Sequence, residues 1–156
     1  MNTQVTVDFQ LRSTLFSMMR MYNLLATQNG TTQSVSYALL IIEKEGTPAT
    51  KVAPLMGMSS SSLSRLLKNM EDSGLIYKES NLKDRRVVKV FLTEKGVELR
   101  REVKKVVLGF NEKVKKKISK EEFEVFSKVI SIIKEQVQED LAEIQTNGNL
   151  KKQLNI

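Results

Sequence analysis

The chain has 156 residues, and its 25 lysines and arginines outnumber its 18 aspartates and glutamates, which gives a formal net charge of +7. It contains neither cysteine nor histidine. Without thiol and imidazole groups it cannot form a disulfide, a zinc knuckle, a thiol redox switch or a Ser-His nucleophile system. We therefore expect a protein that is not an enzyme and has no cofactor and no metal. The positive charge favours a polyanionic partner, either nucleic acid or a membrane surface.

The hydropathy pattern predicts a cytoplasmic protein. The longest apolar run covers residues 38–42, far short of the about 18 to 20 residues that a membrane-spanning helix needs. The first eight residues lack the basic region and hydrophobic stretch of a secretory signal. The absence of cysteine agrees with a reducing compartment.

Two helices are predicted in the first part of the chain. Over residues 8–26, apolar residues recur every three or four positions, which places them on one face of a helix that ends at Asn29-Gly30. These residues are Leu11, Leu15, Met18, Tyr22 and Leu25. A second helix is predicted from Thr32 or Gln33 to Lys44, and Gly46 stops it. Its inward residues are Val35, Ala38, Leu39 and Ile42.

A helix-turn-helix is predicted next. Residues 51–56 form a short helix, in which Pro54 removes a backbone donor and should kink or shorten the helix. Ala53 and Gly57 have the four-residue spacing that allows a second helix to approach closely and the chain to turn in the left-handed conformation. Ser59 is a good N-cap for that second helix, which ends at Gly74. Its inward residues are Leu63, Leu66, Leu67 and Met70.

The outward face of this second helix carries small hydroxyl side chains followed by basic ones. One interpretation is a flexible serine-rich linker, because serine is a poor helix former. We favour a recognition helix for the major groove of DNA, since hydroxyl groups allow close approach to base edges and Arg65 can pair with guanine. The candidate DNA-binding residues are Ser59, Ser60, Ser61, Ser62, Ser64, Arg65 and Lys68.

Two predicted strands, residues 75–79 and 87–92, enclose a polar, basic turn. Taken alone, this turn would be interpreted as an ordinary solvated hairpin tip. Beside a recognition helix it is better explained as the wing of a winged helix, whose arginines enter or flank the minor groove. The candidate wing contacts are Lys83, Asp84, Arg85 and Arg86.

Two long helices are predicted in the last third of the chain. Thr93 caps the first, and Ser119 with Glu122 forms a capping box for the second. The second helix has a coiled-coil-like apolar seam. The seam consists of Phe123, Phe126, Ile130, Ile133, Val137, Leu141 and Ile144. It could pack within one subunit, but we favour burial between subunits, because the small middle module leaves these helices little core to cover. The basic cluster at residues 113–117 is interpreted as a solvated face.

Four motifs together make the chain resemble the MarR family (multiple antibiotic resistance regulators). They are Ala53-x-x-x-Gly57, Ser59-x-Ser61-x-x-Ser64-Arg65, Glu71-Asp72-Ser73-Gly74-Leu75-Ile76, and Asp84-Arg85-Arg86 leading to Leu92-Thr93-Glu94-Lys95-Gly96. The resemblance implies a mainly α fold with a small two- or three-stranded β wing, in which a winged helix-turn-helix carries long N- and C-terminal dimerisation helices. It also implies that Arg86 is the wing-tip arginine and that Asp84 orders the wing.

The resemblance further implies a division of the chain and a mode of action. Residues 1–30 would form the N-terminal dimerisation helix, 31–96 the DNA-binding region, 97–146 the C-terminal dimerisation helices and 147–156 a flexible tail. Such homodimers usually bind pseudo-palindromic operators in double-stranded DNA and repress transcription until a small, often aromatic or amphipathic effector releases them. The candidate ligand-pocket residues are Met18, Met19, Tyr22, Tyr37 and Phe110, although such residues are usually core.

The sequence leaves two other functions open. The winged helix could be a protein-interaction module in a larger assembly without its own operator, and its DNA binding would then be weak and controlled by salt alone. An enzyme with an isolated carboxylate or lysine site is the weakest alternative. Because cysteine and histidine are missing, thiol-oxidation sensing is excluded and zinc sensing is disfavoured, and we expect an effector to bind noncovalently.

Overall fold

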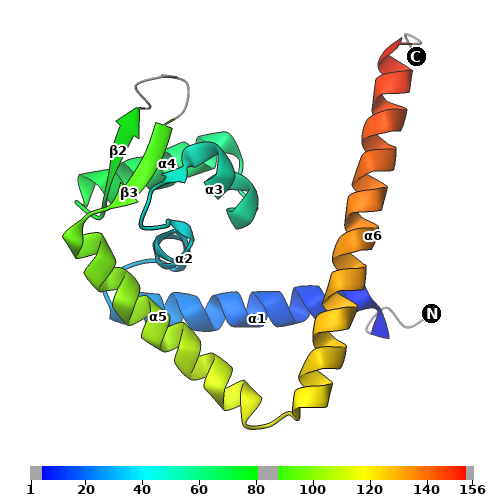
Figure 1. The fold of residues 1–156 in the computed structure, drawn as a ribbon, viewed down its shortest axis with the longest axis horizontal. Helices are drawn as coiled ribbons and strands as arrows, with labels where there is room; N and C mark the ends of the chain where they lie inside the picture. The colour runs from blue at the N-terminus through cyan, green and yellow to red at the C-terminus, as the bar shows by residue number, and fades with distance from the viewer. Residues whose placement is uncertain (1–4, 81–87, 154–156) are drawn as a thin grey trace. The chain divides into compact units, whose positions relative to one another are not determined.

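The computed structural model describes the backbone of residues 5–80 and 88–153, and the side chains of residues 5–80 and 88–146. The chain divides into two compact units, Met1–Leu108 and Gly109–Ile156. The first unit contains helices α1 to α4, a small sheet and the larger part of α5, and the second contains the end of α5 and all of α6 (Figure 1).

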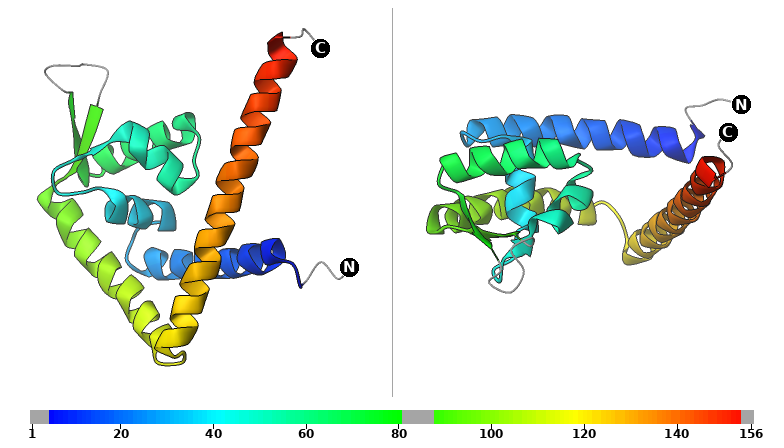
Figure 2. Two further views of the ribbon diagram at one scale, coloured as in Figure 1. Left: turned by 45° about the vertical axis from the view of Figure 1, so that its right-hand side comes forward. Right: turned by 90° about the horizontal axis from the view of Figure 1, so that it is seen from above.

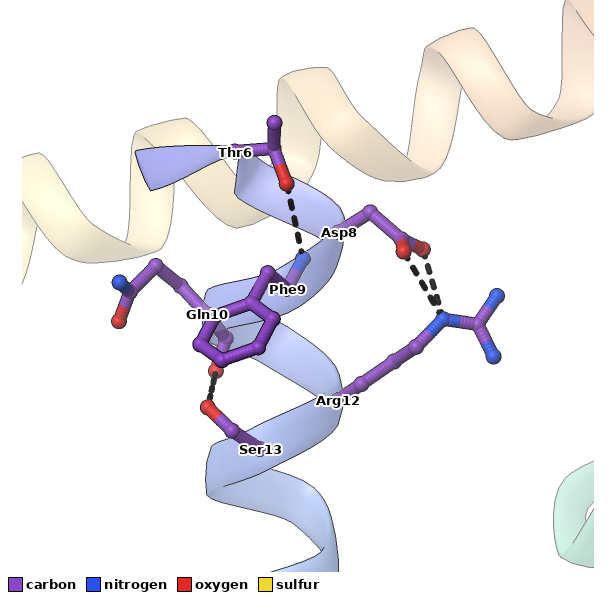
Figure 3. Close-up of polar contacts among 6 residues, drawn as sticks. All are labelled: Thr6, Asp8, Phe9, Gln10, Arg12 and Ser13. Carbon is purple, nitrogen blue, oxygen red and sulfur yellow. Dashed lines mark hydrogen bonds and ion pairs between the residues drawn. The ribbon is translucent and has the colours of Figure 1, made fainter. Parts of the chain in front are cut away.

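Helix α1 (Val7–Gln28) begins with a side-chain cap and an ion pair. The Thr6 hydroxyl accepts a hydrogen bond from the Phe9 amide at 3.2 Å (Figure 3). One turn further on, the Arg12 guanidinium pairs with Asp8 at 2.8 Å. Asp8 lies in the first turn, where a negative charge is stabilised by the helix dipole. The helix predicted over residues 8–26 is confirmed.

Helix α2 (Gln33–Ile41) begins at the predicted cap but ends three residues before Lys44, so the predicted end is wrong. The Thr32 hydroxyl accepts from the Val35 amide at 3.3 Å. At the other end, the Glu43 amide donates to the Thr47 hydroxyl at 2.9 Å instead of continuing the helix. The chain therefore leaves the helix at Ile42, whose side chain is completely buried.

Strand β1 (Thr47–Pro48) and helix α3 (Ala49–Met56) follow. The sequence did not place this strand, and α3 begins two residues before the predicted start. The helix continues through Pro54 to Met56. Pro54 therefore does not end it, and the chain turns at Gly57 instead.

Helix α4 (Ser60–Asp72) leads into strands β2 (Ile76–Ser80) and β3 (Val88–Leu92). The strands form an antiparallel sheet in the order β1-β3-β2. Helices α2, α3 and α4 gather beside this sheet (Figures 1 and 2). The largest completely buried side chains of the resulting core are Leu39, Ile42, Val52, Met70 and Val90. The predicted mainly α fold with a small β wing is confirmed.

Helices α5 (Glu94–Lys115) and α6 (Lys120–Gln153) both begin at the predicted caps. The Thr93 hydroxyl accepts from the Gly96 amide at 3.1 Å. At α6, the Ser119 hydroxyl accepts from the Glu122 amide at 3.2 Å, while the Glu122 carboxylate accepts from the Ser119 amide at 2.7 Å. This reciprocal pair is the predicted capping box. The α6 backbone stays helical to its last described residue, inside the range that the sequence predicts as a tail.

The long helices expose much of their apolar surface. On α1, Leu11 and Leu15 are 38% and 54% exposed, whereas Met18, Tyr22 and Leu25 are half-buried. On α6, five residues of the predicted seam are exposed, and the other two, Ile130 and Ile133, are half-buried. The exposed five are Phe123, Phe126, Val137, Leu141 and Ile144. Among the residues that the structure describes, no helix has the length and apolar character to cross a membrane.

Candidate nucleic-acid interface

The turn between α3 and α4 determines where α4 begins. Gly57 has φ +61° and ψ 31°, a left-handed conformation that residues with a β-carbon rarely adopt. The Met58 amide donates to the Ala53 carbonyl at 3.1 Å and closes the end of α3. Ser59 is extended, and its hydroxyl accepts from the Ser62 amide at 3.3 Å. The predicted helix-turn-helix, with Gly57 in the turn and Ser59 as N-cap, is confirmed.

The serine hydroxyls at the start of α4 bind one another and the helix backbone. Ser59 Oγ lies 3.1 Å from Ser61 Oγ and donates to Ser62 Oγ at 3.0 Å. Ser64 Oγ donates to the Ser60 carbonyl at 2.9 Å. These residues form an ordered first turn of a helix, which excludes the flexible-linker interpretation. Each hydroxyl oxygen keeps acceptor capacity, and its proton can rotate toward a new acceptor.

The outward face of α4 lies opposite three buried residues, Leu63, Leu67 and Met70. Exposed side chains follow one another along it at intervals of one or three residues. They are Ser61, Ser64, Arg65, Lys68, Asn69 and Asp72. Ser60 is exposed at the flank, and Ser62 is half-buried. Within the described residues Arg65 and Lys68 make no ion pair, and both side chains are exposed.

Asn69 is a candidate site residue that the sequence reasoning missed. It lies one turn after Arg65 on the same exposed face. Its side-chain oxygen accepts a hydrogen bond from the Ser73 hydroxyl at 3.3 Å, a contact that uses neither of its two N–H donors. The spacing of four residues from Arg65 was the available signal, because such residues share a helix face.

Strands β2 and β3 form the base of the predicted wing, and β2 is tied to α4. Lys78 Nζ lies 2.6 Å from Glu71 Oε2. The rings of Tyr77 and Phe91 stack across the two strands with centroids 5.2 Å apart. The predicted wing contacts Lys83, Asp84, Arg85 and Arg86 lie outside the described residues. The structure therefore describes the base of the wing and leaves the tip a prediction.

The five candidate ligand-pocket residues differ in exposure. Met18, Tyr22 and Phe110 are half-buried, whereas Met19 and Tyr37 are exposed. Burial raises the pKa of the Tyr22 phenol above its usual value, so the neutral form is favoured. An open hollow of about 360 Å³ lies elsewhere, at the start of α5. It is lined by Leu92, Thr93, Glu94, Val97, Glu98 and Arg101. The ligand pocket stays a prediction.

Comparison with known protein families decides what kind of winged helix this is. The sequence model of the MarR family matches residues 32–88. The winged-helix region is therefore similar to that of the MarR family. The match begins at the N-cap of α2 and ends at the first residue of β3. It therefore includes α3, the recognition-helix candidate α4 and the whole stretch between β2 and β3.

Solved structures of MarR-family transcriptional regulators share the fold. MepR of Staphylococcus aureus, solved in complex with DNA, matches with a TM-score of 0.76 at 19% identity over 85% of this chain and 98% of MepR. A MarR-family regulator from Listeria monocytogenes, solved with a 26mer DNA, matches with a TM-score of 0.78 at 20% identity over 90% and 95% of the two chains. The transcriptional regulator SlyA matches with a TM-score of 0.76 at 18% identity over 86% of this chain and 96% of SlyA. The MarR fold thus extends well beyond the matched residues.

Proposed function

We propose that this chain is a cytoplasmic, homodimeric transcriptional regulator that binds a pseudo-palindromic operator in double-stranded DNA and acts as a repressor. The observation that carries the proposal is the outward face of α4. There Arg65 and Lys68 have no ion-pair partner in the described part of the chain and lie beside exposed serines. The planar fork of Arg65 fits guanine O6 and N7, and Lys68 fits a phosphate. The two MarR-family regulators solved with DNA support this assignment.

The wing is proposed as the second DNA contact. Lys83, Arg85 and Arg86 would lie in or beside the minor groove, where a narrow groove concentrates negative potential, and Asp84 would order the wing. The family match supports this role, because it extends through all four residues. The ion pair between Lys78 and Glu71 also supports it, because a wing tied to α4 would dock together with α4.

The exposed apolar faces of the long helices support a dimer. Burial of one large apolar side chain contributes roughly 1.5 to 3 kcal/mol. Phe123, Phe126 and Leu141 all lie on one face of α6 and are between 45% and 56% exposed. A second copy of the chain would cover such faces, and two-fold symmetry would present α4 at two half-sites about 10 base pairs apart.

Replacing Phe126 by lysine should weaken the dimer at least about 100-fold, because the lysine charge would be buried at the interface without a partner. The matched control is Glu135→Lys, which places the same side chain on the opposite face of α6. Sedimentation velocity over a range of protein concentrations measures both variants. Equal dimerisation of Phe126→Lys and wild type would contradict an interface on this face of α6.

Selection from randomised DNA duplexes tests the function directly. Wild-type protein should enrich a pseudo-palindromic sequence and bind it at least about 1000-fold more tightly than random duplex at physiological salt. Titration at several salt concentrations separates sequence reading from phosphate attraction. Equal affinity for selected and random duplexes would contradict the proposal and favour the protein-interaction module, which predicts a stable protein partner instead.

Release by a small effector is the regulatory part of the proposal. The chain has no thiol to oxidise and no imidazole to bind zinc. A noncovalent ligand is therefore the effector chemistry that its side chains support best. Aromatic and amphipathic molecules are the class to test, by their ability to dissociate the protein from its selected operator.

A further inference from the structure

Two sets of hydrogen bonds hold the C-terminal end of α4. The first lies within the turn that follows α4, and the second comes from the start of α5. The Gly74 amide donates to the Glu71 carbonyl and the Leu75 amide to the Met70 carbonyl, each at 2.9 Å, and Gly74 has φ +68°. This pattern is the Schellman end of a helix, and it confirms Gly74 as the predicted stop. It leaves the carbonyls of Ser73, Gly74 and Leu75 for other donors.

Three consecutive carbonyls accept hydrogen bonds from two residues at the start of α5. Ser73 accepts from Lys95 Nζ at 2.8 Å, and Gly74 accepts from Thr93 Oγ1 at 2.7 Å. Leu75 accepts from the Thr93 amide at 3.1 Å. The Thr93 hydroxyl also accepts from the Gly96 amide, so it caps α5 and holds the end of α4 at once. We call this set of contacts the α4–α5 clamp.

We expect the clamp to affect the orientation of α4 relative to α5 rather than the burial of α4 in the core. Leu63, Leu67 and Met70 already hold one side of α4 in the core. The clamp adds polar contacts at the end of the helix, where the Lys95 side chain reaches Ser73 from an exposed position. Hydrogen bonds are directional, and the fixed positions of three neighbouring acceptors restrict rotation of α4 against α5. Loss of the Lys95 contact should therefore loosen this angle without opening the core.

We propose that Thr93 and Lys95 are positioning residues that set the angle between the recognition helix α4 and the dimerisation helix α5, and thereby the operator spacing that the dimer accepts. This inference rests on the proposed function, since spacing has meaning only for a dimer that reads two half-sites. A change of one base pair moves one half-site by about 3.4 Å and rotates it by about a tenth of a turn. A rigid α4–α5 pair should reject such a change, and a loosened pair should tolerate it.

The test compares operators whose half-sites are moved apart or together by one base pair, starting from the sequence selected by wild-type protein. Wild type should lose at least about tenfold in affinity on each altered spacing. Lys95→Met should bind the original spacing about three- to tenfold more weakly, because one charge-assisted hydrogen bond is lost. When the spacing is altered, the affinity of Lys95→Met should fall less than about threefold below its own affinity for the original spacing. Lys95→Arg and Thr93→Ser retain the donors and should keep the strict spacing of wild type.

Two results would overturn the clamp while the proposed function stands. If Lys95→Met weakened binding by the same factor at every spacing and made it less salt-dependent, Lys95 would be a phosphate contact. If the variant kept the tenfold loss at altered spacings, other contacts would set the angle of α4. Thermal unfolding of Lys95→Met should stay near that of wild type, because the side chain is exposed. A wild-type protein that selected no operator would instead overturn the proposed function and the clamp's role with it.

Discussion

Replacing Arg65 by alanine is expected to reduce affinity for the selected operator by about 30-fold or more. A bidentate arginine–guanine pair contributes roughly 1 to 3 kcal/mol of discrimination, and a dimer makes the contact twice. The side chain is exposed on α4 and has no ion-pair partner among the described residues, so its removal should leave the fold intact. Fluorescence anisotropy at a fixed salt concentration measures the loss.

The pattern of loss across DNA sequences separates Arg65 from its neighbour Lys68. Arg65→Ala should relax the preference at one base-pair position in each half-site and leave the other positions unchanged. Lys68→Ala should weaken all sequences alike and reduce the dependence of log affinity on log salt by about one for each copy. Lys104→Ala, which removes an exposed charge from α5, serves as the control. If Arg65→Ala weakened selected and random duplexes equally, the proposed orientation of α4 in the major groove would be contradicted.

The starts of most helices could be predicted because an N-cap depends on residues close together in sequence. Ser59, Thr93 and Ser119 each accept from an amide three residues further on, and each begins a helix as predicted. Gly57 was equally readable, since a left-handed turn between two short helices favours glycine. These local contacts place α4 and its outward serines without knowledge of the rest of the chain.

Features that depend on distant residues were not readable from local patterns. Helix α2 ends early because the Glu43 amide bonds to Thr47, which belongs to the next element. Strand β1 forms because Thr47 pairs with Val90, which comes after the helix-turn-helix in the sequence. The role of Lys95 likewise depends on a carbonyl 22 residues earlier in the chain.

The candidate site was predicted as a helix face rather than as a complete set of side chains. Arg65 and Lys68 were predicted because basic residues on a capped helix are a recognised pattern, whereas Asn69 is uncharged and was not predicted. Apolar periodicity identified the α6 seam, but periodicity reports amphipathic character and not the partner. We propose a second copy of the chain as that partner. The dimerisation experiment with Phe126→Lys tests this proposal, which the sequence alone could not do.

Replacing Gly96 by alanine is expected to destabilise the protein strongly, although it adds only one methyl group. Gly96 lies in the first turn of α5, and an added β-carbon would collide with the Leu75 carbonyl oxygen. That oxygen cannot retreat freely, because it accepts the Thr93 amide at 3.1 Å as part of the clamp. Overpacking against a constrained backbone should destabilise the protein by about 3 kcal/mol or more, which lowers the melting temperature by roughly 6 to 12 °C.

Gly109→Ala is the matched control, because it adds the same methyl group to the same helix. The space around the position of its β-carbon is open in the described chain. Alanine is favoured over glycine in a helix interior by about 1 kcal/mol, so this variant should be as stable as wild type or slightly more stable. Urea and thermal unfolding at a fixed protein concentration compare the two. Equal stability of both variants would show that α5 can move away from Leu75, and a joint that moves so easily could not hold α4 at one operator spacing.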